Sequence, residues 1–260
     1  MDERQKTAGR EFLKDNLRLQ IDFYRSDQNR GVAAPPLQKP PRPEQVFLQL
    51  PGEAHWQGFA GTDLLQAIKA RRSHRSFSPQ SLTLAEVALL LWATQGVRGV
   101  AGPGSALRTV PSAGCRHAFE SYLLVSNVEE LAPGIYRYLP VEHALVLERA
   151  CSEETLARQL QPASLNQSFV ARAPLVLAWT AIPYRMEWRY LEAAYRVMLL
   201  DAGHLCQNLY LACEALGAGT CAIAAYHQPL MDQLLGVDGE EEFTIYMAPV
   251  GKLSTGAAGS

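Results

Sequence analysis

The feature that most constrains the fold of this chain is a helical pattern at residues 192–216, where apolar side chains recur around almost the whole circumference. At about 1.5 Å per residue, a helix of this length crosses a whole domain. A helix that is apolar on nearly all sides must be buried in a core or in an interface. Its polar exceptions are His204, Gln207 and Asn208, which we expect to be buried groups with hydrogen-bond partners.

Shorter patterns surround this helix. A capping box at 83–86, Thr-Leu-Ala-Glu, predicts the start of a mostly buried helix. Apolar runs and alternation predict strands at 120–126, 135–140, 144–147, 173–180 and 243–252, and a strand followed by a loop at 220–227. Further helices are predicted at 62–69, 152–161 and 231–235. The glycine-rich segment 96–104 is predicted to be a loop.

The N-terminal part has a different character. Residues 9–27 show a partial apolar stripe that predicts an amphipathic helix. Residues 31–43 are rich in proline, which favours an extended spacer over a ligand for a partner domain. In a dimer, such an arm is able to wrap the neighbouring subunit. We therefore expect a helix and arm at 1–50, one domain at 51–253 and a flexible tail at 254–260.

Composition limits the partners. The chain has 260 residues, of which 48% are hydrophobic, and a formal net charge of −2. A net charge this small and negative does not attract nucleic acid or an anionic membrane. No apolar run reaches the roughly 20 residues of a membrane span, and no secretory signal is visible, so we expect a cytoplasmic protein. Five scattered cysteines without a Cys-X-X-Cys pair argue against a disulfide framework, and no metal site is predicted.

The most specific chemistry lies in a basic cluster. Arg71, Arg72, Ser73 and Arg75 lie within a few residues at the expected end of a helix, with apolar residues before them and Phe77 after them. Cations are favoured at a helix C-terminus, so a solvated helix end is one interpretation. The planar guanidinium group also holds phosphate well. The apolar flanks favour the second interpretation, because they fix the arginines on packed structure.

This Arg-X-Ser-X-basic-X-Phe run resembles the FMN phosphate-binding segment of the nitroreductase family, and in particular its SagB-type branch of thiazoline/oxazoline dehydrogenase-like proteins. The resemblance extends over residues 62–252. It implies an α+β fold with a central, mostly antiparallel sheet flanked by helices, a long buried central helix and domain-swapped dimer arms. It also implies a homodimer with FMN at the subunit interface.

The resemblance implies roles for particular residues. Arg71, Arg72, Ser73 and Arg75 would contact the phosphate, with Arg75 also placed for the flavin O2 atom. The segment Pro111, Ser112, Ala113 and Gly114 would lie against the flavin ring from the second subunit, although by itself it is also an ordinary turn. The remaining cofactor-binding residues would be Ile223, Ala224, Ala225, Gly251 and Lys252.

Several positions depart from the family pattern or leave alternatives open. Ala224 and Ala225 stand where many members have Glu-Gly. Their backbone amides are still able to contact the flavin, but no carboxylate is present at this position. Lys252 is also explained as a solvated chain end. Arg189 and Tyr190 match a basic-Tyr pair implicated in catalysis, with Arg in place of Lys. Because Arg holds its proton, Tyr190 is the better candidate for proton chemistry and Arg189 for anchoring.

The implied activity is FMN-dependent oxidoreduction. No Gly-X-Gly-X-X-Gly fingerprint is present, so NAD(P)H would be a transient hydride donor in a ping-pong cycle with nitroaromatic, quinone-like or related acceptors. One alternative is oxidation of peptide azolines to azoles, with FMN reoxidised by oxygen. Another is a flavin-binding module without turnover. A nucleophilic hydrolase ranks low because no Gly-X-Ser-X-Gly elbow is found.

Overall fold

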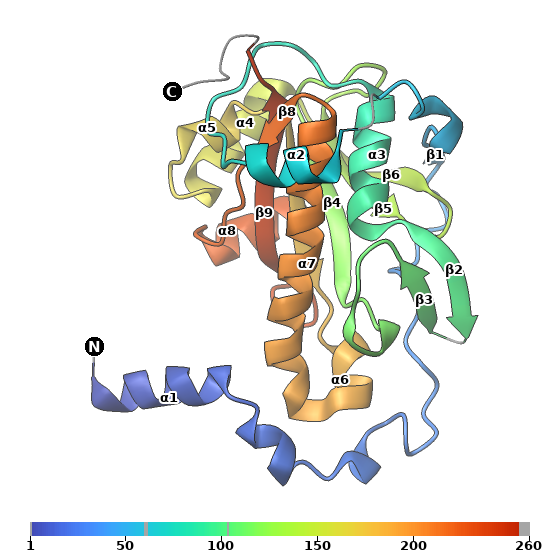
Figure 1. The fold of residues 1–260 in the computed structure, drawn as a ribbon, viewed down its shortest axis with the longest axis vertical. Coiled ribbons are helices and arrows are strands. Elements are labelled where there is room, and N and C mark those ends of the chain that lie inside the picture. Colours follow the sequence, from blue (N-terminus) through green and yellow to red (C-terminus); the bar gives the residue numbers. More distant parts are fainter. Residues whose placement is uncertain (1, 60–61, 103, 255–260) are drawn as a thin grey trace.

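An antiparallel sheet forms the centre of the structure (Figure 1). The computed structural model describes residues 2–59, 62–102 and 104–254. Within them, seven strands pair in the order β1-β6-β5-β4-β7-β9-β8. The strands are β1 Phe47–Gln49, β4 Phe119–Val125, β5 Gly134–Leu139, β6 Ala144–Ala150, β7 Leu175–Ala181, β8 Ala218–Thr220 and β9 Phe243–Lys252. The predicted hairpin is confirmed as β5 paired with β6.

Helices cover both faces of this sheet (Figure 1). One face carries α3 Leu84–Gln95 and α7 Ala194–Ala215, which share a hydrophobic core with the sheet. The other face carries α4 Glu153–Ala163, α5 Ser168–Ala171 and α8 Gln228–Leu235 around a second core. α2 Leu64–Ala70 and α6 Tyr184–Tyr190 contact α7. The α+β fold with a mostly antiparallel sheet flanked by helices is therefore confirmed.

The long helix α7 packs one side into the core, which agrees with the prediction of a helix buried in a core or in an interface. Its inner side contributes Met198, Leu205 and Leu209 to the core. On its outer side, Leu199 is 48% exposed and Leu200 is 54% exposed. The outer apolar side chains that predicted burial are therefore not covered by this chain's own residues.

The polar residues of α7 differ from the prediction. Asn208 finds the expected partner, because its side-chain amide donates to the carbonyl oxygen of Ala93 at 2.9 Å. His204 and Gln207 are exposed, which makes the prediction of buried groups wrong for both. They lie on the outer side of the helix, where water satisfies them.

The N-terminal helix begins and ends earlier than predicted. α1 spans Glu3–Leu13, with Asp2 as its capping residue, and the helix does not continue to residue 27. Short 3₁₀ turns follow, and others occur later in the chain, at η1 Asn16–Gln20, η2 Phe23–Arg25, η3 Glu53–His55, η4 Ala113–Cys115 and η5 Leu191–Ala193. α1 buries none of its residues and projects from the body (Figure 1).

The proline-rich segment is extended, and it is anchored on the chain's own sheet. The backbone N–H of Lys39 donates to the Glu120 carboxylate at 2.7 Å. Arg137 donates to the carbonyl oxygen of Lys39 at 2.6 Å, and Arg108 to that of Leu37 at 2.6 Å. Farther on, β1 lies within the expected N-terminal range and pairs with β6. This part of the chain is therefore built into the domain.

Two further predictions concern the glycine-rich segment and the tail. Residues 96–104 are not a loop, because a hairpin of β2 Val97–Gly102 and β3 Ser105–Arg108 forms there. Its register is irregular, which is how it accommodates several glycines. The predicted tail at 254–260 lies outside the described residues, apart from Ser254.

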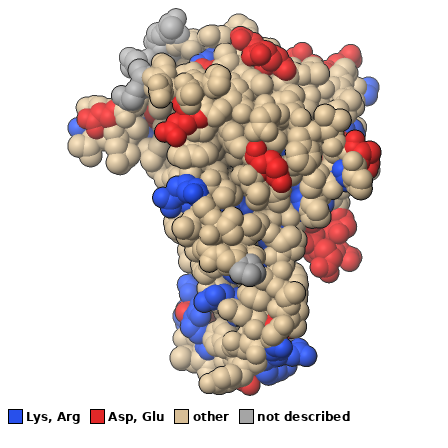
Figure 2. Space-filling model, turned by 90° about the vertical axis from the view of Figure 1, so that its right-hand side faces the viewer, with Lys and Arg blue, Asp and Glu red and all other residues tan. Residues whose placement is uncertain are grey.

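Charge is distributed without a dominant sign. On the face shown in Figure 2, basic and acidic side chains are scattered between uncharged areas. No helix in the described part of the chain is long and apolar enough to cross a membrane. Among the same residues, no group of three or more His, Cys, Asp or Glu side chains is arranged to hold a metal ion. All five cysteines are free thiols.

Candidate functional site

The basic cluster forms an extended segment that begins where α2 ends. Arg71 caps α2, and Ser73 then pairs with Thr220 of β8 in a parallel bridge. The His74 N–H donates to the Thr220 carbonyl oxygen at 2.9 Å. Farther along, the Ser78 N–H donates to the Lys252 carbonyl oxygen at 2.8 Å. The cluster is therefore fixed along the edge of the sheet.

Two glycines allow this segment to approach the sheet. A Cβ atom on Gly219 would lie 2.8 Å from the Cβ of His74, and one on Gly251 would lie 2.8 Å from the Cβ of Phe77. Gly219 and Gly251 are opposite each other in the β8–β9 pair. Gly251, predicted to contact the cofactor, thus makes room for Phe77 and positions the basic segment.

The guanidinium groups of the segment have no acidic partner in the described part of the chain. Arg71, Arg72 and Arg75 form none of the ion pairs found there. Arg71 lies over the ring of Tyr210, with its guanidinium carbon 5.0 Å from the ring centroid. Arg75 lines a cavity of about 270 Å³ that also contains Arg172. Positive charge is therefore gathered here without neutralisation.

Tyr210 joins the basic segment to the predicted flavin-facing segment. Its hydroxyl lies 2.9 Å from the Ser73 hydroxyl and accepts from the Ala222 N–H at 2.8 Å. Beyond Ala222, Ile223 is buried and exchanges backbone hydrogen bonds with Met247, while Ala224 and Ala225 are exposed. Sequence reasoning missed Tyr210, which is hidden among the apolar residues of α7.

Lys252 is engaged within the chain. Its ammonium group donates to the Glu86 carboxylate and, at 3.0 Å, to the Leu216 carbonyl oxygen. Its charge is therefore partly neutralised before any ligand binds, and its role at a phosphate stays a prediction.

The second predicted element is the segment Pro111–Gly114, which is held in a strained turn. Gly114 has a φ of +59°, and Cys115 and His117 have φ values of 54° and 48°. Such values are rare for residues with a side chain and recur at functional sites. The Ala113 N–H donates to the Asp201 carboxylate of α7 at 3.3 Å. Burial raises the pKa of Asp201, although hydrogen bonds from Ser112 and Ala113 oppose this.

Arg189 and Tyr190 lie directly against this turn. They are the last residues of α6, and Leu191 after them has a φ of 49°. A Cβ atom on Gly114 would lie 2.6 Å from the Tyr190 hydroxyl and 3.1 Å from two atoms of Arg189. The Arg189 guanidinium lies 5.5 Å from the Tyr190 ring centroid. The structure thus brings the predicted catalytic pair and the predicted flavin-facing turn together.

A buried ionic network supports this second element. Glu120 of β4 accepts from Arg185 of α6 at 2.5 Å, and both side chains are about 2% exposed or less. Arg116 follows the turn, and its Nε donates to the Arg185 carbonyl oxygen at 3.0 Å. Its guanidinium stacks over Trp188 at 4.5 Å. Sequence reasoning missed this network, because single buried arginines give no local pattern.

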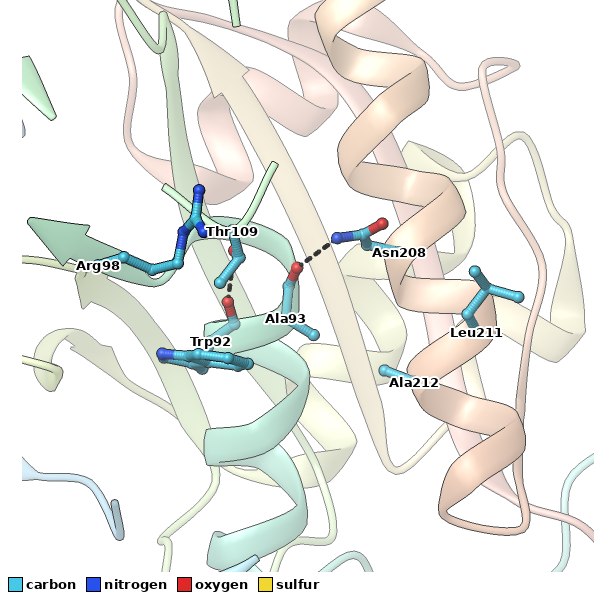
Figure 3. A pocket seen from close by; sticks show the side chains of 7 residues that line it. All are labelled: Trp92, Ala93, Arg98, Thr109, Asn208, Leu211 and Ala212. Atoms are coloured by element: carbon cyan, nitrogen blue, oxygen red, sulfur yellow. Dashed lines mark hydrogen bonds between the residues drawn. The ribbon is translucent and has the colours of Figure 1, made fainter. Parts of the chain in front are cut away.

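The two halves of the predicted site lie apart within one chain. The basic segment contacts α7 at Tyr210, and the turn contacts it at Asp201, nine residues earlier. At 3.6 residues per turn and 1.5 Å per residue, these positions are about 14 Å apart along the helix axis and on opposite sides of the helix. A cavity of about 470 Å³ between α3 and α7 (Figure 3) is lined by Trp92, Arg98 and Asn208, among others, and by none of the predicted site residues.

Comparison with known proteins identifies the family. The nitroreductase family model matches residues 68–252. The chain is 34% identical over 182 residues, 70% of its length and 87% of the relative's, to a protein of Methanocaldococcus jannaschii that carries the nitroreductase name. A crystal structure of a nitroreductase-named protein from Ralstonia eutropha superposes with a TM-score of 0.66 at 26% identity, over 86% of this chain and 95% of that one.

A third match concerns the predicted branch. The chain is 26% identical over 140 residues to the microcin B17-processing protein McbC of Escherichia coli, covering 52% of this chain and 51% of McbC. It thus spans about half of that relative. The predicted resemblance, including its SagB-type branch, is confirmed. The chain belongs to the nitroreductase family.

Proposed function

We propose that this protein is an FMN-dependent oxidoreductase that uses NAD(P)H to reduce nitroaromatic, quinone-like or related small-molecule acceptors. The observation that carries the proposal is the extended segment with three arginines that pair with no carboxylate in the described chain, next to the Ser73 hydroxyl. A phosphate monoester matches this donor set, because charge-assisted bonds from Arg forks to phosphate are strong. The residues present therefore fit the phosphate end of FMN.

Each element has a distinct role in this proposal. Arg71, Arg72 and Ser73 hold the phosphate, and exposed Ala224 and Ala225 offer backbone to the flavin edge. When bound, FMN supplies the redox chemistry, accepting a hydride from NAD(P)H and passing electrons to the acceptor. Tyr190 presents a hydroxyl beside the turn at Gly114, where it orients the acceptor.

The complete site requires a homodimer in this proposal. The turn and the basic segment meet α7 on opposite sides, which supports a site that combines elements of two subunits. The exposed apolar residues Leu199 and Leu200 of α7, with Leu64 and Leu65 of α2, offer a surface for the second subunit. The partner's turn would then complete the site.

Flavin binding tests the proposal directly. Arg71→Ala with Arg72→Ala removes two phosphate contacts of about 1.5–3 kcal/mol each, so the FMN Kd should rise about 100-fold or more. Arg4→Ala with Arg10→Ala is the matched control, since it removes the same charge from exposed α1. Wild-type protein should also be yellow and bleach with NADH or NADPH. A double variant that keeps its flavin and still bleaches would contradict the phosphate role of Arg71 and Arg72. Wild-type protein that is yellow but never bleaches would indicate a flavin-binding module without turnover.

The dimeric site has its own test. A chain with Arg71→Ala and Arg72→Ala is co-expressed with a differently tagged Gly114→Val chain, and heterodimers are purified through both tags. Each heterodimer contains one site with both wild-type elements, so about one FMN per dimer is expected, against none in either homodimer. A heterodimer as empty as the two homodimers would place both elements in the same subunit's site.

A second candidate function is the oxidation of peptide azolines to azoles. Two observations favour it: the contact of Tyr190 with the turn at Gly114, and the similarity to McbC, a microcin B17-processing protein. The substrate would lose two hydrogen atoms, and oxygen would reoxidise FMN. A peptide thiazoline incubated with protein and oxygen should lose the mass of two hydrogens, and Tyr190→Phe should slow this loss while flavin stays bound. An unchanged peptide mass, with acceptor reduction intact, would exclude azoline oxidation. NAD(P)H-dependent reduction of acceptors would then be the function.

A further inference from the structure

Tyr210 has contacts that a core tyrosine does not need for packing. Its side chain is 9% exposed, and it lies between the basic segment and the chain that leads to Ala224. Its hydroxyl is 2.9 Å from the Ser73 hydroxyl and 2.8 Å from the Ala222 nitrogen. Its ring face carries the Arg71 guanidinium at 5.0 Å. One side chain thus contacts three residues in two parts of the site.

The chemistry of the donors fixes the direction of these hydrogen bonds. The Ala222 N–H is only able to donate, so it donates to the Tyr210 oxygen. If Ser73 also donated to that oxygen, the phenolic hydrogen would be left without an acceptor in a buried position, which is costly. The phenol therefore donates to Ser73, and the Ser73 hydrogen is left to point outward from an exposed residue.

We propose that Tyr210 is a positioning residue that makes Ser73 a dedicated hydrogen-bond donor to the phosphate of FMN. The relay runs from the Ala222 N–H through the Tyr210 hydroxyl to the Ser73 hydroxyl. Because the Ser73 oxygen already accepts from Tyr210, its own hydrogen is free to donate. Ser73 therefore favours a ligand atom that only accepts, such as a phosphate oxygen. The stacked Tyr210 ring also holds Arg71 in place before the ligand arrives. This inference rests on the proposed function.

The test compares two ligands that differ only in the phosphate. FMN and riboflavin are titrated against wild-type protein and Tyr210→Phe, with flavin fluorescence as the readout. Phenylalanine keeps the ring under Arg71 and loses the relay. The FMN Kd should rise about tenfold, the size of one hydrogen bond to a charged group, while the riboflavin Kd stays the same. The phosphorus NMR signal of bound FMN should shift toward that of free FMN.

Two further variants make the result specific. Ser73→Ala, at an exposed side chain, should show the same selective loss, and the double variant should lose no more than either single one. Tyr136→Phe is the matched control, because it removes a buried hydroxyl that donates to the Ala132 carbonyl oxygen at 2.8 Å, away from the site. It should leave the ratio of the two Kd values unchanged.

The outcomes separate the inference from the proposed function. Wild-type protein that binds no FMN overturns the proposed function. Wild-type protein that binds FMN, with an unchanged FMN-to-riboflavin ratio in Tyr210→Phe or in Ser73→Ala, overturns only the relay. If Tyr210→Phe does not fold, as judged by circular dichroism, Ser73→Ala remains as the test, and an unchanged ratio there overturns the relay because it leaves Ser73 without a role at the phosphate. Equal weakening of both flavins would also overturn the relay, because it indicates a general loss of structure.

Discussion

Gly114→Ala is the substitution for which the structure gives the sharpest expectation. Gly114 has a φ of +59°, where a residue with a Cβ atom costs about 1–2 kcal/mol. The new Cβ would also lie 2.6 Å from the Tyr190 hydroxyl, closer than real contacts allow. Tyr190 is half-buried, so it would rotate away at a further cost of about 0.5–1.5 kcal/mol. We therefore expect a total loss of about 1.5–3.5 kcal/mol in the free energy of unfolding.

Gly217→Ala is the matched control for this substitution. Gly217 has the same φ of +59°, and no heavy atom lies within 4 Å of the point that a Cβ atom would occupy there. It should therefore show the backbone cost alone, about 1–2 kcal/mol in urea unfolding. Acceptor turnover should fall in Gly114→Ala and stay unchanged in Gly217→Ala. Equal stability losses with equal turnover would refute the contact between Tyr190 and Gly114.

Three other predictions concern the scaffold. Burial, and then the charge of Arg108, lowers the pKa of His117 to about 3. The stability contributed by neutral His117 is complete above the unfolded pKa of about 6.5 and is lost progressively as the pH falls toward the folded pKa of about 3. His117 should therefore lower the free energy of unfolding by about 2 kcal/mol from pH 8 to pH 5, and His117→Gln should remove this share of the pH dependence in urea titrations. Thr83→Ala should lose about 1 kcal/mol in the same assay, because it removes the capping box of α3. Glu86→Gln should lose about 1–3 kcal/mol by leaving Lys252 without its charge partner, and adding Lys252→Met should restore part of this loss.

Much of the fold follows from local patterns in the sequence. The capping box at Thr83 predicts the start of α3, and α2, which Asp63 caps, lies close to the predicted range 62–69. β9 runs from Phe243 to Lys252, the whole predicted range. These elements are specified by hydrogen bonds and side chains within a few residues, so periodicity and capping rules are sufficient to find them.

The wrong predictions arise where contacts between segments outweigh the preferences of single residues. Glycines at 96–104 favour a loop locally, but the β2–β3 pairing decides for a hairpin. The stripe at 9–27 favours one helix, but η1 and η2 follow instead, and Asp15 pairs with Arg196 of α7 at 3.1 Å. Local propensity is a weak prior where tertiary contacts intervene.

The segments of the candidate site are predictable from the sequence, but the contacts between them are not. Each of its segments has a local signal, such as the arginine cluster or the Pro-Ser-Ala-Gly turn. The residues that connect these segments have no such local signal. Tyr210 looks like another core residue of a helix, and Asp201 like a solvated acid, until the fold places them beside Ser73 and Ala113.

The buried ionic network explains why a proline-rich segment belongs to the domain. Proline lacks an N–H, so such a segment has carbonyl oxygens that no regular partner satisfies. Arg137 donates to the carbonyl oxygens of Lys39 and Pro40, while Glu120 accepts the Lys39 N–H. Glu120 also binds Arg185 of α6, the helix that ends in Tyr190. Because breaking a buried ion pair is costly, the same carboxylate fixes both the extended segment and the helix that presents the candidate catalytic pair.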